Sequence, residues 1–204
     1  MANLFLDIET VSQNEKPPLD SIKVPANYKK TETIAEYQKE HQDEAWRRQA
    51  LDSMQGRIIC IGWAIDDEPI GILSSLNECD LILEFSTIIS LFKETPNFIG
   101  WNIQTFDLPW LWRKAIQHHN TSLRRFIPKD NRHLICDLMR IWATDPYRDY
   151  VSLADCADFL GIKHGDVNGA DIHDLWQAGN LEEIREHCRQ DIETTRKIYN
   201  RIFN

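Results

Sequence analysis

Two carboxylates near the start of the chain have a spacing that could place both of them around one cation. Asp7 and Glu9 lie in residues 3–9, a segment with the two-residue period of a β-strand. Residues two apart on a strand project to the same side, so both carboxylates face the same way. On a buried face they would repel each other unless a cation neutralised them. A solvated face would need no cation, and this pair alone is consistent with either arrangement.

A second polar group follows a short apolar segment in the middle of the chain. In the sequence GWNIQTFDLPWL, Asn102 and Phe106 precede Asp107, which stands beside the start of a predicted helix. Aspartate in this position often caps the helix by accepting a backbone N–H group. Capping does not account for Asn102 and Phe106, or for the strand predicted at 97–101, which would place Asp107 at an edge of the sheet.

The third group lies in a helix predicted at residues 181–202. His187 and Asp191 are four residues apart, so they share one helical face, about one turn from each other. A surface ion pair would have the same spacing. These two residues, however, lie beside the apolar stripe of the helix and therefore border the core; the stripe consists of Ile184, Cys188, Thr195, Ile198 and Ile202.

The three polar groups must be positioned by the strands and helices that the rest of the sequence predicts. Besides the strands named above, the patterns predict strands at 57–65 and 69–74, a strand or short helix at 134–142, and helices at 81–93, 108–118 and 152–160. This order, with an early hairpin, indicates an α/β fold, a mixed sheet flanked by helices.

We expect a single domain over residues 1–204, with an insertion at about 11–54 after the first strand. The insertion begins with a proline-containing segment without periodicity, and residues 33–54 have the pattern of one polar helix. Its basic residues suit a lid over substrate, and a dimerisation element is the alternative; these residues are Lys16, Lys23, Lys29, Lys30, Arg47 and Arg48.

Composition excludes several classes of protein. Hydrophobic residues make up 42% and aromatic residues 10% of the chain, which does not fit a disordered or low-complexity protein. No apolar run has the length of a membrane span and no secretory leader is visible, so we expect no membrane association and a cytoplasmic location. The five cysteines form no Cys-x-x-Cys pair, and the motifs of phosphate loops, zinc peptidases and serine hydrolases are absent.

The net charge of −9 argues against a protein that coats nucleic acid by bulk electrostatics. Basic residues nevertheless gather in one segment, which contains Arg113, Lys114, Arg124, Arg125, Lys129 and Arg132. This segment suits phosphate binding along a single strand, and a solvated helix end and loop is the alternative. Three nearby indoles suit either core packing or base stacking; they belong to Trp101, Trp110 and Trp112.

Together, the three polar groups resemble the Asp-Glu-Asp-Asp (DEDD) 3′–5′ exonucleases of ribonuclease H-like fold, over roughly residues 3–199 and in the same order and spacing. The segment GWNIQTFDLPWL is similar to the exonuclease domains attached to B-family DNA polymerases. Residues 166–199 resemble the stand-alone bacterial and phage proteins called B-polymerase-like predicted 3′–5′ exonucleases.

The resemblance implies an enzyme that hydrolyses phosphodiester bonds from the 3′ end of single-stranded nucleic acid and releases nucleoside monophosphates. DNA is the favoured substrate and RNA the alternative. The implied ligands of two Mg²⁺ or Mn²⁺ ions are Asp7, Glu9, Asp107 and Asp191. The candidates for contacts with the substrate are Thr10, Asn102, Phe106 and Arg113, with Phe106 as either a stacking residue or a core residue.

The chain departs from these relatives at the general-base position. Relatives with three residues between the base and the last Asp carry Tyr, and relatives with His carry four, whereas here His187 precedes Asp191 with three between them. We assign His187 to positioning or deprotonating the attacking water. The alternative is that His187 orders a ligand or the scissile phosphate while the metal ions activate water. Asp137 and Asp174 are acidic candidates of second choice.

Two other functions remain open from the sequence. One is a nucleic-acid-binding accessory subunit that has the exonuclease fold but little activity, and the unusual spacing at His187 is its only support. The other is a different ribonuclease H-like nuclease, against which the Asn-x-x-x-Phe-Asp and His-x-x-x-Asp patterns count. A polymerase or repair partner is conceivable, but no residue pattern identifies one.

Overall fold

A mixed sheet forms the centre of the protein. The computed structural model describes residues 1–128, 132–143, 145 and 150–203. Within these residues the sheet has five strands in the order β3-β2-β1-β4-β5; they span Asn3–Val11 (β1), Arg57–Ile65 (β2), Gly71–Ser74 (β3), Asn97–Gly100 (β4) and Ile135–Asp137 (β5). Strand β1 pairs antiparallel with β2 and parallel with β4, so the predicted mixed α/β sheet is confirmed.

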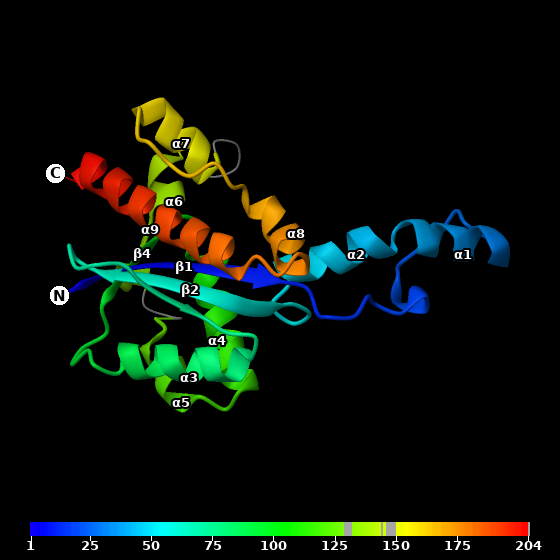
Figure 1. Cartoon of the computed structure of the whole chain (residues 1–204), viewed down its shortest axis with the longest axis horizontal. Helices are drawn as coiled ribbons and strands as arrows, with labels where there is room; N and C mark the ends of the chain where they lie inside the picture. The colour runs from blue at the N-terminus through cyan, green and yellow to red at the C-terminus, as the bar shows by residue number, and fades with distance from the viewer. Residues whose placement is uncertain (129–131, 144, 146–149, 204) are drawn as a thin grey trace.

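Helices cover both faces of the sheet (Figure 1). One layer contains α3 (Glu78–Ile89), α4 (Asp107–Gln117) and α5 (Thr121–Phe126). The other contains α6 (Leu138–Trp142), α7 (Leu153–Leu160), α8 (Ile172–Gln177) and the long α9 (Leu181–Phe203). Short 3-10 turns at Leu19–Ser21, Gln49–Leu51, Arg132–Leu134 and Gly169–Asp171 complete the described elements. No helix of the described residues is long and apolar enough to cross a membrane.

Strand β1 is buried on both faces, which explains its position in the middle of the sheet. Leu4, Leu6 and Ile8 belong to the core under α3 and α4, whereas Phe5 belongs to the core under α9. Asp7 and Glu9 share the face of Phe5 because side chains alternate along a strand. The two carboxylates therefore point toward α9 and not toward a solvated face.

The connection between β1 and β2, residues 12–56, is an arm that extends away from the sheet (Figure 1). It contains α1 (Thr31–Glu40) and α2 (Gln42–Arg48), so the expectation of one helix at 33–54 is wrong. At His41 the backbone leaves the helical conformation, and the ring stacks on Tyr37. The break involves neither glycine nor proline, which explains why the polar pattern did not reveal it.

The last part of the arm, residues 49–56, is called the neck because several hydrogen bonds fasten it to the body. Thr10 donates its hydroxyl to the carbonyl of Ala50 (2.6 Å), and Arg113 donates to the hydroxyl of Ser53 (2.8 Å). The first bond comes from β1 and the second from α4, so the sheet and one helix layer both hold the neck in place.

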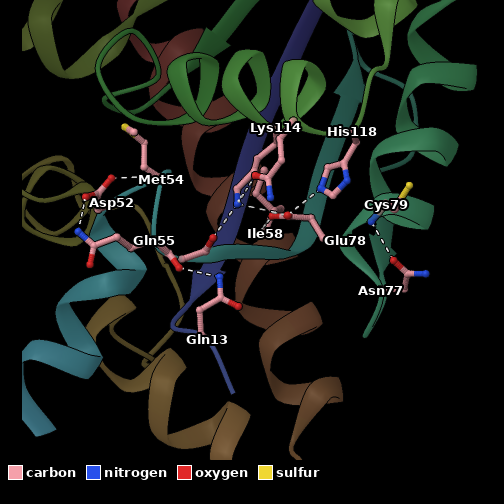
Figure 2. A network of polar contacts seen from close by, with 12 residues as sticks. Gln13, Asp52, Met54, Gln55, Ile58, Asn77, Glu78, Cys79, Lys114 and His118 are labelled. Atoms are coloured by element: carbon pink, nitrogen blue, oxygen red, sulfur yellow. Dashed lines mark hydrogen bonds and ion pairs between the residues drawn. The ribbon is translucent and has the colours of Figure 1, made fainter. Parts of the chain in front are cut away.

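A buried charged network joins the neck to the sheet and to two helices (Figure 2). Glu78 accepts the backbone N–H of Ile58 (2.6 Å) and lies 3.3 Å from the ammonium of Lys114 and 2.9 Å from His118 Nε2. Lys114 also donates to the carbonyl of Gly56 (2.7 Å). Because the side chains of Glu78 and Lys114 are only 7% and 2% exposed, each charge depends on the other for compensation.

We predict that Lys114→Met lowers the free energy of unfolding by about 3 kcal/mol, because it leaves the Glu78 carboxylate buried beside fewer donors. Adding Glu78→Gln to this variant should recover part of the loss, since no unpaired charge then remains. Urea denaturation measures both effects, with the exposed Lys93→Met as the control. A loss below 1 kcal/mol for Lys114→Met, or further destabilisation by Glu78→Gln, would contradict the prediction.

Candidate functional site

Asp107 of the second polar group lies beside Asp7 and Glu9 of the first, at the edge of β1 that β4 leaves open. Strand β4 pairs with β1 only from Asn3 to Phe5, so among the described residues no strand lies on that side of the later part of β1. There the carboxylate of Asp107 accepts the backbone N–H of Ile8 (3.1 Å) and takes the place of a strand partner. The helix α4 has Phe106 as its N-cap and begins at Asp107, so Asp107 does not act as the cap.

Close packing of α9 brings the third group to the same place. Asp7 is paired across the sheet with Gly62, and a Cβ atom on Gly62 would lie 2.7 Å from the sulfur of Cys188. Such a contact is too short for a real side chain, so only glycine lets α9 approach this closely. Cys188 Sγ lies 3.8 Å from the carbonyl oxygen of Asp7, and its helix neighbour His187 reaches the carboxylates.

His187 lies between two of the candidate ligands. Its Nε2 atom is 3.5 Å from a carboxylate oxygen of Glu9 and 3.7 Å from one of Asp191. The histidine is 6% exposed, and its buried Nδ1 atom has no hydrogen-bond partner among the residues that the structure describes. An imidazole in this position can donate to or accept from a group bound between the carboxylates.

Burial raises the pKa values of all four candidate carboxylates, and repulsion by neighbouring carboxylates adds to this for Asp7, Glu9 and Asp107. Burial raises the pKa of Asp7 well above its usual range, and the charges of Asp107 and Asp191 raise it further. The pKa of Glu9 is raised well above its usual range in the same way, by burial and then by Asp7 and Asp191.

The pKa values of Asp107 and Asp191 are raised by burial and lowered by nearby groups. Burial raises the pKa of Asp107 to about 7, although its own N–H group and that of Ile8 stabilise the charged form. Burial also raises the pKa of Asp191, and the positive charges of His187 and His164 act in the opposite direction. Without a cation, part of this cluster retains its protons near neutral pH.

The donor set fits a hard divalent cation. Ligand atoms of Asp7, Glu9 and Cys188 lie within 4.8 Å of one another, and the buried Oδ2 atom of Asp7 has no hydrogen-bond partner within the described part of the chain. Asp107 and Asp191 are not part of this group of three among the described residues, but both raise the pKa of Asp7. Clustered carboxylate oxygens are the ligands that Mg²⁺ and Mn²⁺ prefer.

The loop that carries Asn102 is fixed by Asp137. The buried carboxylate of Asp137 accepts the backbone N–H groups of Asn102 (3.2 Å) and Gln104 (3.1 Å). Asn102 adopts a left-handed backbone conformation with φ of 60°, which asparagine tolerates better than most residues. Asp137 was only a second-choice candidate from the sequence, and its structural role is to hold this loop before α4.

The other candidates for contacts with the substrate have different surroundings. The Thr10 hydroxyl and the Arg113 guanidinium both bind the neck, as described above. Phe106 is half-buried against Trp110, with ring centroids 5.8 Å apart, which agrees with the interpretation of Phe106 as a core residue.

The remaining residues that the sequence suggested for the site lie apart from the carboxylates or outside the described residues. Asp174 forms an ion pair with Arg47 on the arm and does not brace the site. Of the three indoles, that of Trp110 is buried and that of Trp101 donates to the carbonyl of Val151 (3.2 Å). Lys129 of the basic segment lies outside the described residues.

Sequence reasoning missed Gly62 and the part that Cys188 plays. Cys188 was visible only as a member of the apolar stripe of the last helix. Gly62 is the one glycine within the apolar segment RIICIGWAI, and a glycine inside a strand often marks a close approach. That signal was present in the sequence, but only the register of β1 and β2 shows that Gly62 is the partner of Asp7.

The raised pKa values predict how stability depends on pH when divalent ions are removed. In the unfolded chain Asp107 ionises near its ordinary pKa, whereas the folded protein retains that proton up to about pH 7. The folded state therefore loses stability between about pH 4 and pH 7 and does not regain it above that range. Asp107→Asn should remove this loss. In EDTA, the free energy of unfolding of the variant minus that of the wild type should therefore be about 2–4 kcal/mol larger at pH 8 than at pH 4.

Urea denaturation of the wild type and of Asp107→Asn in EDTA, at pH 4 to 8, measures this difference. The exposed Asp20→Asn serves as the control and should show no pH-dependent gain. Adding Mg²⁺ or Mn²⁺ should stabilise the wild type more than Asp107→Asn. A constant difference between Asp107→Asn and the wild type across the pH range would contradict the prediction.

Comparison with solved structures identifies the fold. The chain is similar to the family B DNA polymerase from the hyperthermophilic archaeon Pyrobaculum calidifontis, with a TM-score of 0.65 and 16% sequence identity. The similarity covers 98% of this chain and 24% of the polymerase chain, so the protein spans about a quarter of the polymerase. Together with the mixed sheet and its flanking helices, this confirms the predicted ribonuclease H-like α/β fold.

Comparison of the sequence with protein families gives a match over residues 56–204, to a family described as predicted 3′–5′ exonuclease related to the exonuclease domain of PolB. No curated protein matches the chain. The matched region contains Asp107, His187 and Asp191, while Asp7 and Glu9 precede it and join these residues through the packing of β1. The match extends over most of the chain, and the protein therefore belongs to this family of predicted 3′–5′ exonucleases.

Proposed function

We propose that the protein is a metal-dependent 3′–5′ exonuclease that degrades single-stranded nucleic acid, with DNA as the favoured substrate. One observation carries the proposal: carboxylates from α4 and α9 converge on those of β1 at the open edge of the strand, and their charges raise the pKa values of Asp7 and Glu9. Such repulsion is costly in a folded protein unless the site binds cations. Membership of the exonuclease family supports the same conclusion.

Asp7, Glu9, Asp107 and Asp191 would hold two Mg²⁺ or Mn²⁺ ions. When bound, such ions lower the pKa of the attacking water and neutralise the charge that develops on the leaving oxygen. The Ile8 amide keeps the Asp107 carboxylate oriented toward β1, and the close approach of α9 at Gly62 keeps Asp191 beside Glu9. These contacts set the ligand positions in advance of binding.

His187 is proposed to position the attacking water and to accept its proton. The water oxygen bonds to phosphorus, the bond from phosphorus to the 3′-oxygen breaks, and the 3′-oxygen takes up a proton. The products are a nucleoside monophosphate and a strand shortened by one nucleotide. The location of His187 Nε2, within 3.7 Å of both Glu9 and Asp191, supports this role.

The main prediction concerns matched single-stranded oligonucleotides of DNA and RNA, labelled at the 5′ end, with free or blocked 3′ ends. With Mg²⁺ or Mn²⁺ the protein should remove single nucleotides from free 3′ ends and not from blocked ones, and EDTA should stop the reaction. Asp7→Asn should lower the rate at least ~100-fold, since it removes a charged ligand of the metal ions that would stabilise the transition state. Gel electrophoresis of the products measures the rates.

Asp174→Asn is the matched control, because Asp174 lies apart from the carboxylate cluster and pairs with Arg47. Its rate should equal that of the wild type. Binding of the strands without cleavage under every metal condition would contradict the exonuclease proposal. That outcome would favour the accessory-subunit alternative.

The role of His187 is tested separately. If His187 accepts the proton, His187→Gln should lower kcat about 100-fold with little change in KM, because glutamine fills a similar space but is no base. If His187 only orders a ligand, the amide of His187→Gln should preserve kcat within tenfold while His187→Ala loses it. Steady-state kinetics on a single-stranded oligonucleotide separates the two roles.

A further inference from the structure

One thiol lies among the candidate carboxylates and has no part in the proposed hydrolysis. Cys188 is fully buried, and its sulfur lies within 4.8 Å of carboxylate oxygens of both Asp7 and Glu9. In the described part of the chain, these three residues form the one group of His, Cys, Asp and Glu side chains with metal-binding spacing. The ligands assigned to Mg²⁺ or Mn²⁺ are all oxygens, so the sulfur needs an explanation of its own.

The packing of α9 against the sheet fixes the position of this sulfur. Cys188 Sγ is 3.8 Å from the carbonyl oxygen of Asp7, and a Cβ atom on Gly62 would lie 2.7 Å from the sulfur. Gly62 therefore leaves the space that the thiol occupies. The thiol is held against β1 before any ion binds, and preorganisation of this kind lowers the entropic cost of binding.

Apolar packing explains only part of the surroundings of Cys188. The residue shares a core cluster with Val11, Ile59 and Ile184, and buried cysteine often packs as a small apolar side chain. The adjacent Oδ2 atom of Asp7, however, is buried and has no hydrogen-bond partner in the described part of the chain. Buried polar atoms are normally bonded, so this oxygen indicates a ligand between the thiol and the carboxylates.

A sulfur atom and two carboxylate oxygens form a mixed donor set. Mg²⁺ takes oxygen ligands, whereas Zn²⁺ and its heavier relative Cd²⁺ also bind thiolate. Binding forms a metal–sulfur bond and breaks the S–H bond of the thiol, and the proton passes to the solvent. The donor set therefore favours a thiophilic divalent cation over Mg²⁺.

We propose that Cys188, Asp7 and Glu9 bind a thiophilic divalent cation of the class of Zn²⁺ and Cd²⁺, with the thiolate of Cys188 as the ligand that selects it. This ion takes two carboxylates that the exonuclease proposal assigns to Mg²⁺ or Mn²⁺, so it excludes a catalytic ion and stops hydrolysis. The binding is independent of the proposed function, whereas the inhibition rests on it.

The test uses Cd²⁺ alone as the probe, because a bond between cadmium and thiolate gives an ultraviolet charge-transfer band that carboxylate ligands do not give. All proteins carry Cys79→Ser, since the exposed thiol of Cys79 would bind Cd²⁺ by itself. The protein is treated with EDTA, freed of the chelator and titrated with Cd²⁺. The band should appear and saturate when Cd²⁺ is equimolar with the protein.

Cys188→Ser should remove the band and raise Kd for Cd²⁺ about 100-fold, as expected for the loss of a group that holds a metal ion. Cys188→Ala should give the same losses. The Kd for Mn²⁺, measured by the paramagnetic resonance of the free ion, should change less than about threefold, because Mn²⁺ prefers oxygen ligands.

Cys156→Ser is the matched control, because Cys156 is also buried but belongs to the core cluster that contains Leu138 and Ala157. The band and Kd for Cd²⁺ should remain unchanged in this variant. Thermal melting in EDTA confirms that each variant is folded.

Absence of the band from the protein with Cys188 intact, or a band that survives both substitutions of Cys188, would overturn the assignment. Equal losses of affinity for Cd²⁺ and Mn²⁺ would also overturn it, since Cys188 would then act only through packing.

Failure of this site can be distinguished from failure of the proposed function. With Mg²⁺ present, Zn²⁺ should stop the degradation of the labelled strand, and degradation unaffected by saturating Zn²⁺ would overturn the inhibition. If strands are degraded but no band appears, only the thiolate site is wrong. If the band depends on Cys188 but no strand is degraded under any metal condition, the exonuclease proposal fails and the thiolate site stands.

Discussion

The repulsion that Asp107 and Asp191 exert on the two carboxylates of β1 is the constraint on which the rest of the structure depends. Burial and these neighbouring charges make Asp7 and Glu9 harder to ionise. The fold accommodates this with an amide at Ile8 and an imidazole at His187. Neither group neutralises the cluster, and this is the reason for proposing that the cluster binds cations.

Much of the architecture follows from local patterns. The two-residue period around Asp7 marks a strand, and the apolar stripe beside His187 marks the face of a helix that meets the core. Gly161 closes the helix α7 in a left-handed conformation, as a glycine after the last periodic residue predicts. These signals are local, and they are strong wherever one side of an element is buried.

Other features depend on contacts between distant segments, and the sequence does not contain them in readable form. Asp107 has a residue type that often caps helices, yet it lies in the first turn of α4 and its carboxylate accepts the N–H group of Ile8, 99 residues earlier in the chain. Asp137 holds the loop around Asn102 only because β5 lies beside β4. The break at His41 occurs where the ring stacks on Tyr37 one turn earlier, a contact that the polar pattern does not reveal.

The length of the arm affects how the register of β1 and β2 is set. Val11 and Arg57 are cross-strand partners, so the arm leaves and rejoins the sheet at neighbouring positions. A tight hairpin would fix the register of β1 and β2 by the geometry of its turn, but a connection of this length cannot. Closing it costs about 2 kcal/mol more than closing a hairpin of a few residues. The register therefore depends on the buried side chains of the two strands and on the contacts of the neck, since a slip of one residue would separate Asp7 from Gly62 and turn both carboxylates of β1 to the opposite face of the sheet.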